Sequence, residues 1–302
     1  MSTTYYEKCP IEMFYTIFDK SQKGVELTDE EFYEIQRLKG RVTLNLLQTN
    51  AFRVHLEKVF SSSCAYRYLR HLDELELLEK VFPSIHALKG IDGGHYHNET
   101  VFTHVMNSLR AIEKLDLPWF VKLAALYHDC GKQKYEDFDD GRRRFNNHAS
   151  FGAQLVESDL RRLKFSRDIV DTLKTLVSVH MQQVDGKKSI FKLKRILDEH
   201  KIPFKYFMWV RYADNKGSVK CKTDFMFYWR LYKACLKTLN PKHEPSISDL
   251  DINGHDLMST FNKEPGPWLG VILKKMFVEW QEGTLENTKD VLIAFAKEHL
   301  HD

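Results

Sequence analysis

Residues 121–132, with the sequence VKLAALYHDCGK, are the most informative part of this chain. Its apolar run from Val121 to Tyr127 predicts a buried helix, and His128-Asp129 follows directly. An ionised Asp at the buried end of a helix costs free energy unless a partner compensates its charge. A divalent metal ion would be such a partner. We therefore expect a metal site at His128-Asp129.

More candidate ligands lie on both sides of this pair. Each has an ordinary explanation when taken alone, because a His on an amphipathic helix is more often a surface or core residue and the chain contains 14 His. The ordered set is the informative signal. Imidazole together with carboxylate suits Mn, Fe, Co, Ni, Zn and, less well, Mg. The predicted metal ligands are His104, His128, Asp129, His148, His180 and Asp214.

These ligands divide into one complete site and one optional site. We expect His104, His128, Asp129 and Asp214 to bind one ion, with open positions for water or substrate. The two remaining His would add a second ion, with Asp129 bridging both. A pair of metal ions suits phosphoester hydrolysis, because one ion activates water and both neutralise phosphate oxygens.

Helical geometry limits how His128 and Asp129 can share an ion. The two residues lie about 100° apart on a helix of 3.6 residues per turn, so the helix must end close to them. We expect Gly131 to end it as a C-cap. Lys132 would then lie just beyond the metals, where its ammonium holds a substrate phosphate. The alternative is that Lys132 only compensates the helix dipole.

The composition is that of an ordinary globular protein. Of the 302 residues, 43% are hydrophobic and 29% are charged. We see no apolar stretch long enough to cross a bilayer and no signal-peptide pattern, so we expect a cytoplasmic protein without a membrane partner. The five Cys form no CxxC pair, which favours a reducing compartment over a disulfide framework or a zinc ribbon.

Positive charge is concentrated in residues 186–242, which contain 15 Lys or Arg against 4 Asp or Glu. Aromatic side chains interleave with these cations from Phe204 to Tyr232. Both features suit a nucleotide or RNA partner, although solvated helix faces and core aromatics explain them equally well. Arg211 lies one turn before Asp214 and is predicted to contact the substrate phosphate.

Helical periodicity dominates, and strand alternation is nearly absent, so we predict an all-α fold. Thr28 and Glu31 form a capping box. The pair His255-Asp256 is expected to be a helix start and not a metal site. We divide the chain into an N-terminal helical region (1–90), a metal-bearing domain (91–240) and a C-terminal helical subdomain (241–302). The expected helices cover 28–47, 51–60, 65–72, 75–82, 99–114, 118–131, 148–163, 167–182, 188–199, 203–216, 222–239, 256–261, 267–282 and 287–299.

The order H…HD…H…H…D resembles the HD superfamily of metal-dependent phosphohydrolases. From about Leu47 onward, the chain also resembles the C-terminal part of bacterial CCA-adding tRNA nucleotidyltransferases that carry an HD domain. The matching stretches are LELLEKVFPSIHAL (75–88), FNNHASFG (145–152), Tyr212-Ala213-Asp214 with Gly217, INGHDLM (252–258) and PGPWLG (265–270).

The chain departs from that family in its first 50 residues. The family needs a Gly-Ser phosphate loop and two carboxylates spaced Asp-x-Asp in a nucleotidyltransferase head. Residues 1–50 contain neither feature and are too few for such a head. We therefore expect that this chain does not add CCA.

The resemblance implies an all-α HD-domain helical bundle with N- and C-terminal helical extensions. It implies a hydrolase that uses one or two divalent ions to cleave a phosphoester of a nucleotide or an RNA end, with a 2′,3′-cyclic phosphate favoured. Asp129 would orient the metals and the nucleophile, while Lys132 and Arg211 would stabilise charge on the phosphate. The alternatives are a cyclic oligonucleotide phosphodiesterase, an RNA- or tRNA-binding module with a vestigial HD site, and a purely structural metal site.

Overall fold

The computed structural model describes residues 5–92, 100–134, 136–137, 143–218, 223, 225–239 and 246–300. Within these residues the secondary structure is helical apart from an isolated bridge between Asp92 and Thr100 and two antiparallel strands of two residues each, β1 (Glu136–Asp137) and β2 (Arg143–Arg144). This confirms the predicted all-α fold. The sequence also predicts a Gly-rich loop at 89–98 and a linker at 241–245. The whole linker and residues 93–98 of the loop lie outside the described residues. No helix in the described part of the chain is long and apolar enough to span a membrane.

The chain forms two compact units. The first contains residues 1–181 and 200–228, and the second contains residues 182–199 and 229–302. All six predicted metal ligands belong to the first unit. The division into 1–90, 91–240 and 241–302 stays a prediction.

The first unit begins with short helices that pack around a buried apolar core. Thr28 and Glu31 form the predicted capping box: the Glu31 N–H donates to Thr28 Oγ1 at 3.2 Å, and the Thr28 N–H donates to Glu31 Oε2 at 2.8 Å. The helix that follows ends at Leu38, well before the predicted residue 47. These helices are α1 (Tyr5–Lys8), α2 (Glu12–Lys23), α3 (Asp29–Leu38), η1 (Lys39–Arg41), α4 (Leu44–Leu47), α5 (Asn50–Ser61), α6 (Ala65–Glu74), α7 (Leu78–Val81) and α8 (Pro83–His86).

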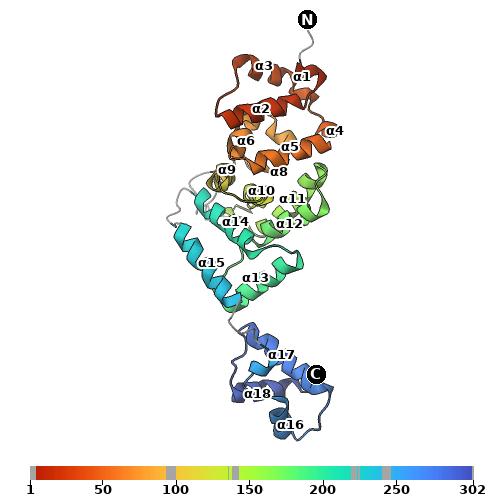
Figure 1. Ribbon diagram of the computed structural model, residues 1–302, viewed down its shortest axis with the longest axis vertical. Helices are drawn as coiled ribbons and strands as arrows, with labels where there is room; N and C mark the ends of the chain where they lie inside the picture. The colour runs from red at the N-terminus through yellow and green to blue at the C-terminus, as the bar shows by residue number, and fades with distance from the viewer. Residues whose placement is uncertain are drawn as a thin grey trace. The chain divides into compact units, whose positions relative to one another are not determined.

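Five longer helices of the same unit carry the predicted ligands. Helix α9 packs against α10 and α14, and α11 packs against α12 (Figure 1). Their facing sides are apolar and fully buried, as at Leu109, Leu126 and Val177. The helices are α9 (Val101–Ile112), α10 (Trp119–Tyr127), α11 (His148–Arg162), α12 (Arg167–Val179) and α14 (Phe204–Gly217), with the short η2 (Cys130–Gln133) after α10.

The second unit has a core of its own around Leu257, Met276 and Leu292. His255-Asp256 lies at a helix start, as expected: Asp256 closes a capping box with Asn253. Helix α15 (Phe225–Leu239) runs from the first unit into the second. The remaining elements are α13 (Lys187–Glu199), η3 (Ile247–Asp249), α16 (Gly254–Phe261), α17 (Pro267–Gln281) and α18 (Lys289–His299).

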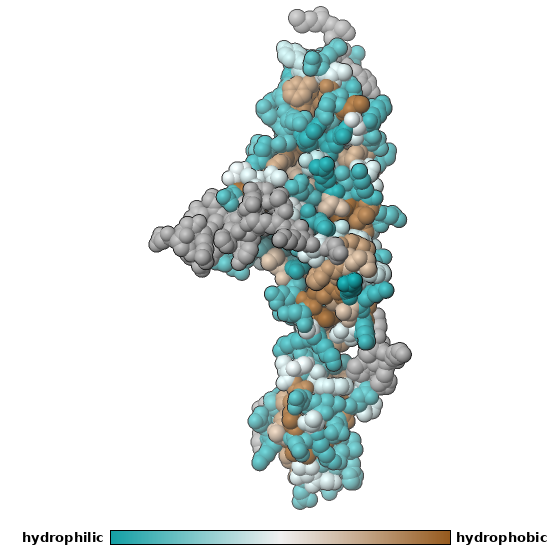
Figure 2. Space-filling view, turned by 90° about the vertical axis from the view of Figure 1, so that its left-hand side faces the viewer, coloured by the Kyte–Doolittle hydropathy of each residue, from teal (hydrophilic) through white to brown (hydrophobic). Residues whose placement is uncertain are grey.

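Hydrophilic side chains cover most of the face drawn in Figure 2, with smaller apolar patches between them. Large apolar side chains that remain exposed include Phe225, Phe227 and Trp229 at the start of α15.

Candidate metal centre

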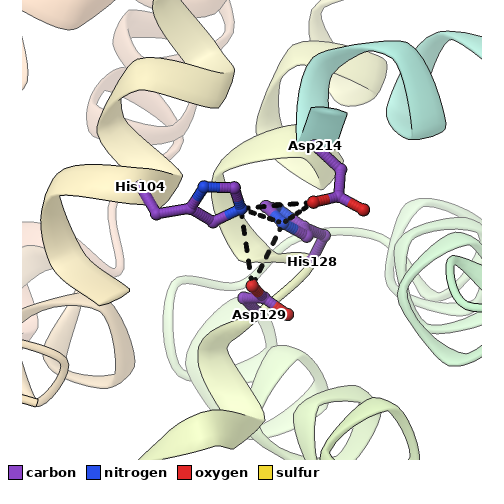
Figure 3. Close-up of side chains that lie close together, drawn as sticks. All are labelled: His104, His128, Asp129 and Asp214. Carbon is purple, nitrogen blue, oxygen red and sulfur yellow. Dashed lines mark hydrogen bonds and ion pairs between the residues drawn. The ribbon is translucent and has the colours of Figure 1, made fainter. Parts of the chain in front are cut away.

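Four predicted ligands from three helical elements meet at one point (Figure 3). His104 comes from α9, His128-Asp129 follow the end of α10, and Asp214 comes from α14. His104 Nε2 lies 3.1 Å from His128 Nε2, 3.2 Å from Asp214 Oδ1 and 3.5 Å from Asp129 Oδ2. His128 Nε2 lies 3.4 Å from each of the same two carboxylate oxygens. We call these four residues the first cluster.

The other two predicted ligands lie on the far side of Asp129. Its second oxygen, Oδ1, is 3.4 Å from His148 Nε2 and 3.5 Å from His180 Nε2. The two Nε2 atoms are 3.3 Å apart. We call Asp129, His148 and His180 the second cluster. The carboxylate of Asp129 therefore presents one oxygen to each cluster.

The spacing of these atoms fits ligands around an ion. Metal–ligand bonds of about 2.0–2.2 Å place neighbouring ligand atoms about 3 Å apart. The first cluster brings four nitrogen and oxygen atoms together and the second brings three, with the atoms of each cluster all within 4.8 Å of one another. Imidazole and carboxylate donors together suit a first-row transition ion or Mg.

Hydrogen bonds to the backbone fix three of the imidazole rings. His128 Nδ1 donates to the Ala125 carbonyl at 2.8 Å, His148 Nδ1 donates to Phe145 at 2.8 Å, and His180 Nδ1 donates to Val177 at 2.6 Å. A neutral ring that donates through Nδ1 has only a lone pair at Nε2. Such bonds orient metal-binding His in general.

The second cluster brings together three atoms that accept hydrogen bonds and have no proton to donate. His148 and His180 turn two Nε2 lone pairs toward each other and toward a carboxylate oxygen. Three acceptors at this separation repel one another unless a cation lies between them. A bound divalent ion satisfies all three, so the donor set fits a metal.

Burial strengthens the electrostatic coupling of the first cluster. His104, His128 and Asp129 are each at most 2% exposed. Burial alone would lower the pKa of His128, but Asp129 and Asp214 raise it to about 10. Burial would raise the pKa of Asp129, but Lys132 and His128 hold it well below its usual range. Without a bound ion, His128 is therefore protonated, and its positive charge partly compensates the carboxylates of Asp129 and Asp214.

The end of α10 differs from our prediction. The helix ends at Tyr127, with His128 as a right-handed C-cap, and Gly131 lies within η2. The predicted left-handed C-cap at Gly131 is therefore wrong, because this glycine has no positive φ. Its lack of a side chain serves packing instead: a Cβ there would lie 1.9 Å from the His148 carbonyl oxygen. Gly131 thus lets the two clusters approach each other.

A second close approach supports His104. A Cβ on Gly217, at the end of α14, would lie 2.0 Å from Ser108 Oγ and 2.8 Å from the His104 carbonyl oxygen. Ser108 Oγ itself donates to that carbonyl at 2.9 Å. Gly217 therefore allows α14 to bring Asp214 against α9.

The two predicted phosphate-binding cations lie beside the clusters. Lys132 Nζ is 2.6 Å from Asp129 Oδ2 and 5.4 Å from the Phe145 ring centroid. Arg211 donates through Nη1 to the His180 carbonyl at 3.0 Å. Neither the contact of Lys132 with Asp129 nor that of Arg211 with His180 was predictable from the sequence.

A buried carboxylate behind the site was also missed. Asp159 Oδ2 accepts from Tyr127 Oη at 2.9 Å and from the Ser84 N–H at 3.2 Å, and it is 3% exposed. Burial raises the pKa of Asp159. Within the helix sequence ESDLRR, this residue resembles an ordinary surface acid. Its contacts tie the last residue of α10 to α11 and α8, and so support the backbone that carries His128-Asp129.

Comparisons with known proteins agree with this site. Residues 101–211 match the family model described as HD domain, which includes five of the six ligands and ends three residues before Asp214. Residues 230–296 match the model described as tRNA nucleotidyltransferase domain 2, putative.

Curated relatives are similar over most of this chain. The CC-adding tRNA nucleotidyltransferase of Thermus thermophilus is 27% identical over 231 residues, which are 75% of this chain and 51% of that protein. The A-adding tRNA nucleotidyltransferase of Deinococcus radiodurans is 26% identical over 231 residues, 74% of this chain and 52% of that protein. The chain thus spans about half the length of these relatives. A solved structure of a CCA-adding enzyme with CTP aligns with 98% of this chain and 61% of its own at 10% identity, with a TM-score of 0.47, too low to establish a shared fold.

Proposed function

We propose that this chain, which carries an HD domain and is homologous to CCA-adding enzymes, is a metal-dependent phosphohydrolase that cleaves a phosphoester of a nucleotide or an RNA end. One observation carries the proposal: the two oxygens of Asp129 face two separate His clusters. Two ions bridged by a carboxylate are an arrangement suited to phosphoester hydrolysis.

Bound divalent ions supply a water of lowered pKa and neutralise negative charge on the phosphate. The chain's own residues supply the geometry. The four imidazoles and two carboxylates hold the ions in place, and the backbone hydrogen bonds of His128, His148 and His180 keep each Nε2 directed inward. Asp129 sets the spacing between the two positions.

Lys132 is the first candidate for contact with the substrate phosphate. Its ammonium already lies at the edge of the first cluster, against Asp129. With a divalent ion bound there, the Asp129 carboxylate would be compensated by the ion, and the Lys132 ammonium would be free to pair with phosphate. Arg211 is the second candidate, because a guanidinium has five N–H donors and the His180 carbonyl occupies one of them.

A nucleotide or RNA substrate is supported by the relatives, which are named for tRNA, and by the match of residues 230–296. We favour a 2′,3′-cyclic phosphate. A module that only binds RNA is the second candidate, since the match of residues 230–296 lies outside the sequence segment that contains the six predicted ligands. The presence of all six predicted ligands, close together, favours the hydrolase, because a vestigial site would not be expected to retain every donor atom in place.

A substrate panel tests the proposal. The metal-free chain would be supplied separately with Mn²⁺, Ni²⁺, Co²⁺ and Mg²⁺, and tested on 2′,3′-cyclic AMP, 3′,5′-cyclic AMP, a cyclic dinucleotide and bis-p-nitrophenyl phosphate. We expect turnover of 2′,3′-cyclic AMP that disappears with EDTA and returns with metal. Turnover of the cyclic dinucleotide alone would favour the oligonucleotide phosphodiesterase. No turnover from a folded, metal-loaded protein would support the RNA-binding module.

A further inference from the structure

A second cavity, apart from the metal centre, lies among α2, α6 and the end of α9 in the first unit. Its volume is about 540 Å³, a size typical of small-molecule sites. The charged residues of its wall are Arg67, Arg70, Arg110, Lys114 and Glu113. Four positive charges therefore face one negative charge.

Three of the four cations form no close ion pair with a carboxylate in the part of the chain that the structure describes, although the charge of Glu113 acts on Arg110 and Lys114 at longer range. Within the described part of the chain, no ion pair involves Arg67, Arg110 or Lys114. Arg110 lies over the Tyr66 ring, with its Cζ 5.1 Å from the ring centroid. Arg70 differs, because Glu26 and Glu74 both pair with it and hold it in place. Cations that outnumber the carboxylates lining a cavity attract an anion.

Glu113, the single acidic residue of the wall, forms a structural hydrogen bond. Glu113 is 6% exposed, and its Oε2 accepts the Tyr66 N–H at 2.9 Å. Burial raises the pKa of Glu113, while the hydrogen bond from Tyr66 and the charges of Lys114 and Arg110 oppose that shift. Even with Glu113 ionised, the charged residues of the wall keep an excess of positive charge.

The cavity is separate from the metal centre. Arg110 follows His104 by six residues on α9, which is about 9 Å along the axis and about 120° around it. The two residues thus face different sides of the same helix. A ligand in the cavity would not contact the metal ligands directly.

We propose that this cavity binds a terminal phosphate group, carried by a free nucleotide or by the end of an RNA chain. Guanidinium groups suit this ligand because their planar N–H donors pair with phosphate oxygens in a bidentate manner. Arg67 and Arg110 would make such pairs, and Lys114 would add a point charge. These cations would bind the phosphate, and cleavage would remain at the metal centre.

Calorimetric titration of the metal-free full chain tests this site independently of turnover. The probes are ADP, inorganic pyrophosphate, and one RNA trinucleotide with and without a 5′-phosphate. We expect saturable binding of one pyrophosphate or ADP per chain. Loss of charge-assisted hydrogen bonds in Arg67→Gln/Arg110→Gln/Lys114→Gln should weaken it at least about ten-fold.

A matched triple variant controls for net charge. Lys187→Gln/Lys188→Gln/Lys192→Gln removes three exposed cations from α13 and should change binding by less than about two-fold. The single variant Lys114→Gln, at an exposed position, gives a second reading if the triple variant unfolds. If ADP binds and neither trinucleotide does, the ligand is a free nucleotide. If the trinucleotide binds only with its 5′-phosphate, the ligand is the end of an RNA chain. Absence of saturable binding to the wild type, or equal weakening in the control, would overturn the proposal.

Discussion

Lys132 Nζ lies 2.6 Å from Asp129 Oδ2, the same oxygen that faces the Nε2 atoms of His104 and His128. The ammonium and a divalent ion therefore compete for one carboxylate oxygen. Through this competition, Lys132 links metal binding to substrate binding.

Lys132→Gln should separate these two effects. Removal of the competing charge should tighten Mn²⁺ binding by about three- to ten-fold, while loss of phosphate stabilisation should lower kcat by about 10- to 100-fold. Metal titration and steady-state kinetics on the same samples measure both. Lys134→Gln removes an equal charge from a side chain that contacts the Phe151 ring, and neither quantity should change much. Weaker metal binding in Lys132→Gln would show that the competition is absent.

Metal stoichiometry should follow the division of ligands between the clusters. His148→Ala removes a ligand from the second cluster only, so about one ion per chain should remain of the two we expect for the wild type. Asp129→Ala removes the shared carboxylate and should weaken both positions. Elemental analysis of dialysed protein provides the count. Two ions retained in His148→Ala would contradict the assignment of the second cluster.

Gly217→Ala should damage the fold around His104. The added Cβ would lie 2.0 Å from Ser108 Oγ and 2.8 Å from the His104 carbonyl oxygen, so α9 and α14 must separate. We expect a loss of about 1–3 kcal/mol in the free energy of unfolding, together with weaker metal binding. Gly270→Ala in α17 is the control, because nothing lies within 4 Å of its added Cβ. Urea denaturation compares the two, and equal stabilities would mean that α9 and α14 are not in close contact.

His55 should make stability depend on pH well away from the metal centre. Burial, with a smaller effect of Lys58, lowers its pKa to about 4 from 6.5. The fold therefore favours the neutral ring, which contributes fully above pH 6.5 and loses its contribution as the pH falls toward 4. This pKa difference corresponds to about 3 kcal/mol in the free energy of unfolding. Denaturation of the wild type and of His55→Gln between pH 7 and pH 4 measures it: the wild type should lose more stability, and parallel curves would contradict the assignment.

The sequence was sufficient to predict the all-α fold and the six residues that converge in the two clusters. The ligands stand out because His and Asp at buried helix ends need a partner, and helical periodicity is strong where a single face is apolar. The capping box at Thr28 was also predictable, because it depends only on residues three apart.

Contacts between distant helices could not be predicted in this way. Gly131 has the sequence context of a C-cap, yet its role depends on the His148 carbonyl, which lies 17 residues away. Asp159 resembles a surface acid until α10 and α8 pack against it. The pairing of Lys132 with Asp129 likewise depends on how the chain leaves α10 after Tyr127.

The decisive test of a metal-dependent phosphohydrolase is hydrolysis of 2′,3′-cyclic AMP by the Mn²⁺-loaded chain, compared with a His128→Ala/Asp129→Ala variant. We expect steady turnover by the wild type and a rate at background level for the variant, with most of the helical circular dichroism signal retained. Equal rates for the two proteins would contradict it, because both clusters depend on Asp129.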